Sequence, residues 1–351
     1  MVDRYLLKSY FTKNWLYATI ITLAIYYLSF HFGKLFALAE GDTIIWIPSG
    51  IALAAFFVFG TKIWISIFVG VMLFNIQNFI DFEKNILLTT LGLVGIASIN
   101  TLQGLIGYYY TKLLTNNTDP LKNIYNTLIF IIFGAFFASL VNSLFGVALF
   151  SYFKDDWNSF FSTFLSWFLG GSAGILIFTP LFINLKKECI LITNKVKLIE
   201  FISLILLLYF LINIFFTTGY FFPAALIIPY TLFLIMRFNK LGTSIMVLFI
   251  YFFSAILLKD TTIPNIFSID YPDNPVIPFI FLTIIFSITS LFLSVIFTND
   301  KNLKADLIEK NIELNKWNKI TIDREKRTIE LKNEVNDLLK LQGKEKKYFK
   351  N

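Results

Sequence analysis

The chain has 351 residues, of which 56% are hydrophobic, 18% aromatic and only 15% charged, and its mean hydropathy is +0.69. Soluble domains carry roughly 25% charged residues, and 42 Phe residues exceed what one water-soluble core of this size can hide. The composition excludes a soluble globular protein and, being poor in charge, also a disordered one. It predicts an integral membrane protein.

The cysteine and histidine counts exclude several kinds of site. Cys189 is the one cysteine, so no internal disulfide is possible, and His31 is the one histidine. A single histidine is too few for a histidine-cluster metal site, and we find no pattern for a His-based catalytic triad. We therefore expect no metal, no cofactor and no catalytic residue in this chain.

The membrane-spanning segments follow from apolar length, because a helix needs roughly 20 apolar residues to cross a bilayer. Ten stretches qualify: 14–38, 43–60, 63–80, 86–114, 124–153, 158–185, 197–217, 221–236, 241–258 and 276–298. The stretch 221–236 is short and contains Pro223 and Pro229, so it either spans or re-enters. We expect an all-α polytopic helical bundle of ten spans, with eight as the alternative count.

The charges between the stretches give an independent orientation. With the N-terminus inside, the inner segments hold 12 basic and four acidic residues, and the outer joints hold four basic and nine acidic ones. This asymmetry follows the positive-inside rule and predicts a multi-pass membrane protein with both termini in the cytoplasm. The net charge of +7 is then mostly a matter of topology, and we expect no nucleic-acid partner.

The N-terminus allows a second interpretation. Arg4, Lys8 and Lys13 precede the first apolar stretch, and Ala37-Leu38-Ala39 is similar to a signal-peptidase site. His31 and Lys34 interrupt the approach to that site, and the apolar stretch is longer than a usual signal peptide. We therefore treat 1–13 as a cytoplasmic N-terminus and 14–298 as the transmembrane domain.

The segment 299–341 has a heptad pattern. With Leu303 at position d, the a and d positions are apolar at both ends of the segment and polar between Thr321 and Thr328. This pattern predicts a marginal parallel coiled coil that forms a homodimer. The alternative is a single amphipathic helix on the anionic inner leaflet. No Pro or Gly interrupts the sequence between Phe279 and Gln342, so one continuous helix can run from the membrane into the cytoplasm.

Uncharged polar residues lie inside the spans, whereas Asp, Glu and Arg do not lie in mid-span, which argues against an ion-coupled transporter. Asn100 and Gln103 share one helix face, and such groups either join helices by hydrogen bonds or line a ligand pocket. The ligand-binding candidates are Trp46, Pro48, Asn75, Asn100, Gln103, Asn142 and Trp167. Further amides occur at Gln77 and Asn78, and Ser143 follows Asn142. The ligand, or a membrane partner protein, is unknown.

Two separated motifs resemble a known family. Trp46-Ile-Pro48-Ser-Gly50-Ile-Ala-Leu-Ala, and later Trp167-Phe-Leu-Gly170-Gly-Ser-Ala-Gly174-Ile-Leu-Ile-Phe-Thr-Pro180-Leu, are similar to the signatures of the first MASE-type membrane-associated sensor domain. Arg237-Phe238 is similar to an aromatic and basic joint in its later spans. The resemblance covers roughly 15–298. The chain departs from the family at Gly171, where an acidic residue is usual, and in its number of spans, which is about eight in the family.

The resemblance implies a signal-input module placed before the output domain of a histidine kinase or diguanylate cyclase. The last residues, 342–351, resemble the segment ahead of a phosphoacceptor histidine, which implies a two-component sensor kinase whose output domain is absent from this chain. The alternatives are the input domain of a diguanylate cyclase and a transporter or transport-coupled subunit.

Overall fold

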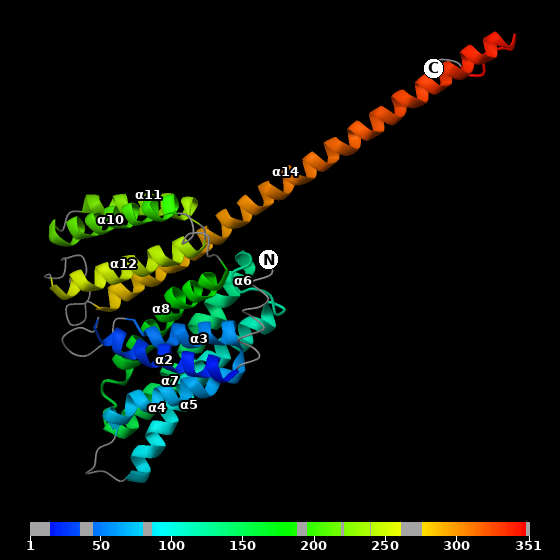
Figure 1. Ribbon diagram of the computed structural model, residues 1–351. Coiled ribbons are helices and arrows are strands. Elements are labelled where there is room, and N and C mark those ends of the chain that lie inside the picture. Colours follow the sequence, from blue (N-terminus) through cyan, green and yellow to red (C-terminus); the bar gives the residue numbers. More distant parts are fainter. Residues whose placement is uncertain are drawn as a thin grey trace. The chain divides into compact units, whose positions relative to one another are not determined.

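The computed structural model describes residues 15–35, 45–79, 86–187, 195–218, 221–238, 240–260 and 276–348. Every regular element in these ranges is helical (Figure 1), which confirms the expected all-α class. The chain forms two compact units, Met1–Phe297 and Thr298–Asn351.

The first unit contains one or more helices at each predicted span. They are α2 (Trp15–Leu35), α3 (Ile47–Phe59), η1 (Thr61–Ile63), α4 (Trp64–Phe79), α5 (Ile86–Leu114), α6 (Ile124–Ile129), η2 (Phe130–Phe137), α7 (Ala138–Lys154), α8 (Phe160–Lys187), α10 (Lys195–Thr218), α11 (Phe221–Arg237), α12 (Lys240–Asp260) and the start of α14 (Val276–Leu341).

Six helical stretches in the described ranges are long and apolar enough to cross a membrane: Trp15–Lys34, Ile86–Leu114, Ile124–Lys154, Phe160–Leu185, Lys195–Ile214 and the one beginning at Phe279. Three others, Ile47–Phe59, Thr61–Ile76 and Lys240–Ile256, are apolar but shorter. A helix rises 1.5 Å per residue, so the 13 residues of α3 extend only about 20 Å, less than the roughly 30 Å hydrocarbon core. The structure therefore supports six spans by length.

Local sequence sets the ends of several helices. Pro48 lies in the first turn of α3, where its missing N–H costs nothing. Gly60 ends that helix with a φ of +86°, a conformation that favours glycine. Asn123 caps α6, because its side chain accepts a 2.8 Å hydrogen bond from the amide of Asn126. These signals fix where the chain turns between the apolar stretches.

The helices of the first unit form two groups. α3 packs against α8, α5 and α2; α4 packs against α2 and α5; and α7 packs against both α5 and α8. In the second group α10, α11 and α12 pack against one another, and α12 also contacts α8 (Figure 1). α8 is therefore the helix that both groups share.

One departure from regular geometry lies inside the fifth predicted span. Its helix runs continuously from Ile124 to Lys154, but Phe130–Phe137 form a π-helix between α6 and α7. The wider turn lies against α5, where a Cβ on Gly107 would come within 2.9 Å of the Gly134 carbonyl oxygen. π-helical segments are rare and occur frequently at functional sites.

The second unit consists of the later part of α14 and a short return. α14 is continuous over 66 residues. It ends in a Schellman motif, in which the amide of Lys344 donates to the Leu339 carbonyl and Gly343 has a φ of +71°. The side chain of Asn336 then accepts from the amides of Lys347 and Tyr348 at 3.0 Å. The chain after the helix thus folds back onto its last turns.

Several expectations concern residues outside the described part of the chain. They include the N-terminal basic residues, the joint at Glu40–Asp42, the signal-peptidase-like site, the joints 81–85 and 261–274, and the final residues 349–351. The side chains of Gln77 and Asn78 also lie outside it.

Candidate functional site

The two family-like motifs meet where α3 crosses α8. A Cβ on Gly50 would come within 2.1 Å of the Gly174 carbonyl oxygen, and a Cβ on Gly174 would come within 2.1 Å of the Trp46 carbonyl oxygen. Real Cβ atoms do not approach that closely, so only glycine fits at either position. The small residues of the motifs therefore let two backbones touch, which is how membrane helices associate closely.

Hydrogen bonds reinforce this crossing. The amide of Trp46, just before α3, donates to the Gly170 carbonyl at 3.0 Å. The hydroxyl of Thr179 donates to the Gly50 carbonyl at 2.9 Å and is fully buried. The start of α3 is thus held against α8 by both backbone and side-chain contacts.

A chain of buried polar groups runs beside the crossing and joins three helices. The Ser49 hydroxyl of α3 donates to the Oε1 of Gln103 on α5, and the Nε2 of Gln103 donates to the Ser139 hydroxyl of α7, each at 3.0 Å. All three side chains are at most 4% exposed. Gly171 of α8 faces the same groups, since a Cβ there would lie 3.2 Å from Ser139 Oγ and 3.3 Å from Gln103 Nε2. We call Ser49, Gln103 and Ser139 the polar chain.

Trp46 belongs to an aromatic cluster with α2 and α4. Its ring meets Phe30 edge-on at 5.4 Å, and Phe30 stacks on Phe74 at 4.2 Å between ring centroids. The ammonium of Lys34 lies 4.6 Å above the Phe74 ring, a cation–π contact. The cluster fixes the orientation of Trp46 next to the polar chain.

The other predicted site residues lie in packed surroundings. Pro48 is buried in the first turn of α3. Asn75 and Asn100 each donate to a carbonyl one turn back in their own helix, those of Val71 and Ile96. The Trp167 ring covers Gly146 of α7, where a Cβ would lie 3.0 Å from the ring. The structure therefore places Trp46 and Pro48 at the start of α3, next to Ser49, which bonds to Gln103.

Asn142 differs from the other amides. It is 4% exposed, and its Oδ1 has no hydrogen-bond partner among the described residues. It lies one turn after Ser139 and one turn before Gly146 on the buried face of α7. A buried acceptor without a partner costs free energy, so the packing around Asn142 is less favourable than around the bonded amides.

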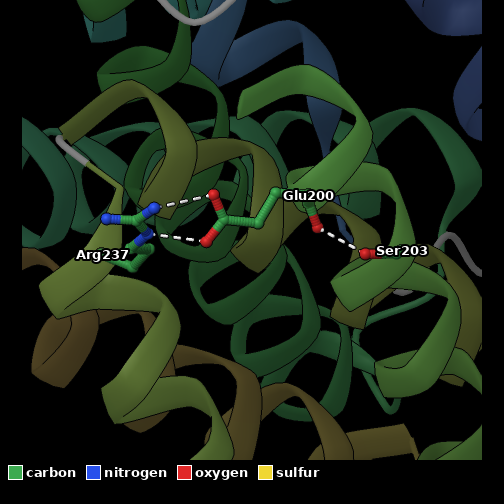
Figure 2. Close-up of polar contacts among 3 residues, drawn as sticks. All are labelled: Glu200, Ser203 and Arg237. Carbon is green, nitrogen blue, oxygen red and sulfur yellow. Dashed lines mark hydrogen bonds and ion pairs between the residues drawn. The ribbon is translucent and has the colours of Figure 1, made fainter. Parts of the chain in front are cut away.

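Arg237 and Phe238, the basic and aromatic joint, bind the end of α11 to the start of α10. Figure 2 shows the guanidinium group facing both carboxylate oxygens of Glu200. Its Nε donates to Oε1 at 2.6 Å and its Nη2 donates to Oε2 at 2.9 Å. The Ser203 hydroxyl donates to the backbone carbonyl of Glu200 at 2.8 Å, also drawn in Figure 2. Phe238 is buried and meets Phe201 edge-on at 4.8 Å. Both residues of the joint therefore contact α10.

The chemistry of the central site is limited to amides and hydroxyls. The polar chain contains no group that titrates near neutral pH, and no cluster of three His, Cys, Asp or Glu side chains suited to a metal occurs in the described ranges. Such groups exchange hydrogen-bond partners rather than protons or electrons.

Sequence reasoning missed half of this site. Ser49, Ser139 and Thr179 were not singled out, because single hydroxyl residues are common in apolar helices. Gly50 and Gly174 were present in the quoted motifs, and their place in both motifs was the available signal. Their mutual contact depends on how the helices cross, which spacing alone does not give.

Comparison with known proteins adds one finding. The sequence model of a protein family described as MASE1 matches residues 17–301. No curated protein and no solved structure matches the chain.

Proposed function

The chain belongs to the MASE1 family of membrane-associated sensor domains, and we propose that it is the signal-input region of a bacterial two-component sensor histidine kinase. The observation that carries this proposal is the continuity of α14, which starts in the helical bundle and runs without a break to Leu341. A sensor needs such an element, because a change in bundle packing has to reach an output domain outside the membrane.

The chain is a multi-pass membrane protein, and we extend this to ten spans in the inner membrane with both termini in the cytoplasm. The charge asymmetry of the joints supports this orientation. The short α3 and α4 count as spans in this proposal, because spans shorter than the bilayer are accommodated by local thinning.

The proposed dimer forms through the tail. Leu303, Leu307, Leu314, Trp317 and Leu338 occupy a or d positions, and each is at least 58% exposed in the single chain. A second copy would cover this stripe in a parallel coiled coil. The polar a and d positions from Thr321 to Thr328 weaken the seam there, which suits a segment that changes register during signalling.

In the proposed mechanism, a ligand or membrane partner biases the packing around the polar chain. Binding shifts the conformation only as far as its affinity differs between two packings. Gln103 contacts both α3 and α7, so a movement of α7 would break its bond to Ser139. α8 would carry that movement to the second helix group.

The first experiment is to read the coding sequence downstream of Asn351. A continuing frame with a His-Glu-containing helix and an ATP-binding domain supports the kinase proposal. A nucleotide-cyclising signature would instead make this the input of a diguanylate cyclase. A stop codon would contradict both and favour a transporter or transport-coupled subunit, which solute uptake into proteoliposomes would test.

The second experiment uses the intact receptor in membrane vesicles and measures autophosphorylation with ATP. Gln103→Met breaks the polar chain and is expected to change the basal rate several-fold. Asn100→Leu, on the same helix face, removes a bond within α5 only and serves as the matched control. Equal rates in both variants and the unaltered receptor would contradict the proposed role of the polar chain.

A further inference from the structure

The chain after α14 turns back onto the helix that it has just left. Gly343 has a φ of +71°, the left-handed conformation that such a helix end needs, and the amide of Lys344 donates to the Leu339 carbonyl at 2.9 Å. Tyr348 then bonds to Asn336, which lies twelve residues earlier in the chain. We call residues 344–348, which return to the last turns of α14, the hook.

Asn336 holds the hook by its backbone. The Oδ1 of Asn336 accepts from the amides of Lys347 and Tyr348, both at 3.0 Å, and its Nδ2 donates to the Tyr348 carbonyl at 2.6 Å. Exposed hydrogen bonds compete with water, so a contact of this kind needs several bonds made together. All three come from one side chain, which makes Asn336 the residue on which the hook depends.

The Tyr348 ring makes a second contact with α14. The ammonium of Lys332 lies 5.8 Å from the centroid of the ring, within the range of a cation–π interaction. Lys332 is one helical turn before Asn336, so the two residues share one face of α14. The hook therefore rests on a defined face of the helix.

The heptad pattern places that face beside the predicted seam. With Leu331 and Leu338 at d positions, Lys332 and Leu339 take e positions. In a parallel coiled coil the e and g positions flank the seam and contact the partner helix. A second copy of the tail would therefore approach Lys332, the side chain that the Tyr348 ring already contacts.

The charges of the same heptad favour contacts within one chain. Arg327 takes the g position that would face Lys332 of a second copy, and like charges placed opposite each other repel. In the single chain Arg327 is paired instead with Glu330 at 3.0 Å and with Glu334 at 3.6 Å. Both cations are thus engaged within their own chain, and neither gains a partner of opposite charge from the other.

We infer that the hook is an autoinhibitory contact that keeps the end of the dimer seam, at Leu331, Val335 and Leu338, from closing. The face beside the seam is occupied by the chain's own residues 344–348, which compete there with a second copy of the tail. Release of the hook from Asn336 lets the two helices pair to the end of α14. The competition rests on the coiled-coil dimer of the proposed function, whereas the hook rests on the bonds of Asn336 alone.

The first test is hydrogen exchange of the full chain in liposomes, followed by mass spectrometry of the peptide that contains the hook. Asn336→Ala removes all three bonds, so exchange in the hook is expected to become several-fold faster. Asn333→Ala makes the same change at an exposed f position and is expected to leave exchange as it is. Equal exchange in both variants and the unaltered protein would overturn the inference.

The second test compares cysteine cross-linking at the two ends of the seam, in a Cys189→Ser background. Adding Asn336→Ala is expected to raise the rate at Leu338→Cys several-fold and to leave the rate at Leu303→Cys unchanged. Gly343→Ala is expected to act in the same way, because alanine is strained at a φ of +71° while no described atom lies within 4 Å of its Cβ position.

The outcomes separate this inference from the proposed function. Cross-linking at Leu303→Cys, with a rate at Leu338→Cys that neither Asn336→Ala nor Gly343→Ala changes, would overturn the inference alone. No cross-link at either position in any variant would contradict the proposed dimer and with it the competition. The exchange measurement still decides in that case whether Asn336 holds the hook.

Discussion

α8 and α10 are both long and apolar, yet the protein buries 83% of the membrane stretch of α8 and only 22% of that of α10. α8 carries the run Gly170-Gly171-Ser172-Ala173-Gly174, whereas α10 is lined with Ile, Leu and Phe. Lipid solvates apolar side chains as well as protein does, so apolarity does not decide which helix is central. Small residues decide which helix is central, because they let the backbones of neighbouring helices approach closely.

The largest effect is expected at the glycine crossing. Gly174→Ala places a Cβ 2.1 Å from the Trp46 carbonyl oxygen, and that atom belongs to backbone that cannot rotate away. Overpacking of this kind costs about 3 kcal/mol in the free energy of unfolding. The measurement is the denaturation of the purified protein in mixed micelles.

Gly33→Ala in α2 is the matched control for Gly174→Ala. Nothing lies within 4 Å of its Cβ position, so the change is expected to be neutral or to stabilise the helix by up to about 1 kcal/mol. Equal destabilisation of the two variants would contradict the claim that close backbone contact makes α8 more sensitive to substitution than the less buried helices.

The next effect concerns the polar chain. Gln103→Met removes two interhelical hydrogen bonds at nearly constant volume, and each such bond contributes roughly 0.6–2 kcal/mol in a membrane protein. Asn100→Leu is expected to cost less, because the Asn100 amide bonds only within α5. A double-mutant cycle between Gln103→Met and Ser139→Ala checks that the loss comes from their contact.

A smaller effect is expected in the second helix group. Arg237→Lys keeps the charge but loses the two-pronged bond to Glu200. Because the two side chains are 50% and 30% exposed, the loss in the free energy of unfolding is expected to be small and to shrink in high salt. A loss independent of salt would show that packing, rather than the ion pair, holds α10 to α11.

The smallest effect is expected at the joint between α7 and α8. The Ser159 hydroxyl and amide donate to the Asp156 carboxylate at 2.6 and 3.3 Å and hold its pKa below the usual range. A lowered pKa stabilises the fold above the unfolded-state pKa, and this contribution is lost as the pH falls through the folded-state pKa. The free energy of unfolding of Asp156→Asn should therefore differ from that of the unaltered protein at neutral pH but not in strong acid. A ¹³C titration of the Asp156 carboxyl group measures the shift of its pKa.

Much of the helix layout was predictable from the sequence, because polar joints bound the apolar stretches; the stretch 86–114 coincides with α5. The π-helix at Phe130–Phe137 was not, since Phe and Ile occur equally in regular helices. The amide side chains of α5 were not predictable in the same way. Asn100 and Gln103 share one face of the helix, yet Asn100 bonds within α5, whereas Gln103 joins α5 to α3 and α7. Whether an amide bonds within its own helix or between helices depends on the partners that neighbouring helices place beside it. For Gln103 these partners are the hydroxyls of Ser49 and Ser139.

The most direct test of the account is cysteine cross-linking of the tail in native membranes, in a Cys189→Ser background. Leu314→Cys places the thiol at an a position and Ile312→Cys places it off the seam, and both side chains are more than half exposed in the single chain. The account predicts a cross-linked dimer for Leu314→Cys and none for Ile312→Cys. It also predicts that adding Gln103→Met changes the rate of cross-linking at Leu314→Cys, whereas adding Asn100→Leu does not. Equal cross-linking at both positions would contradict the parallel dimer. A rate at Leu314→Cys that Gln103→Met leaves unchanged would contradict the coupling between the polar chain and the tail.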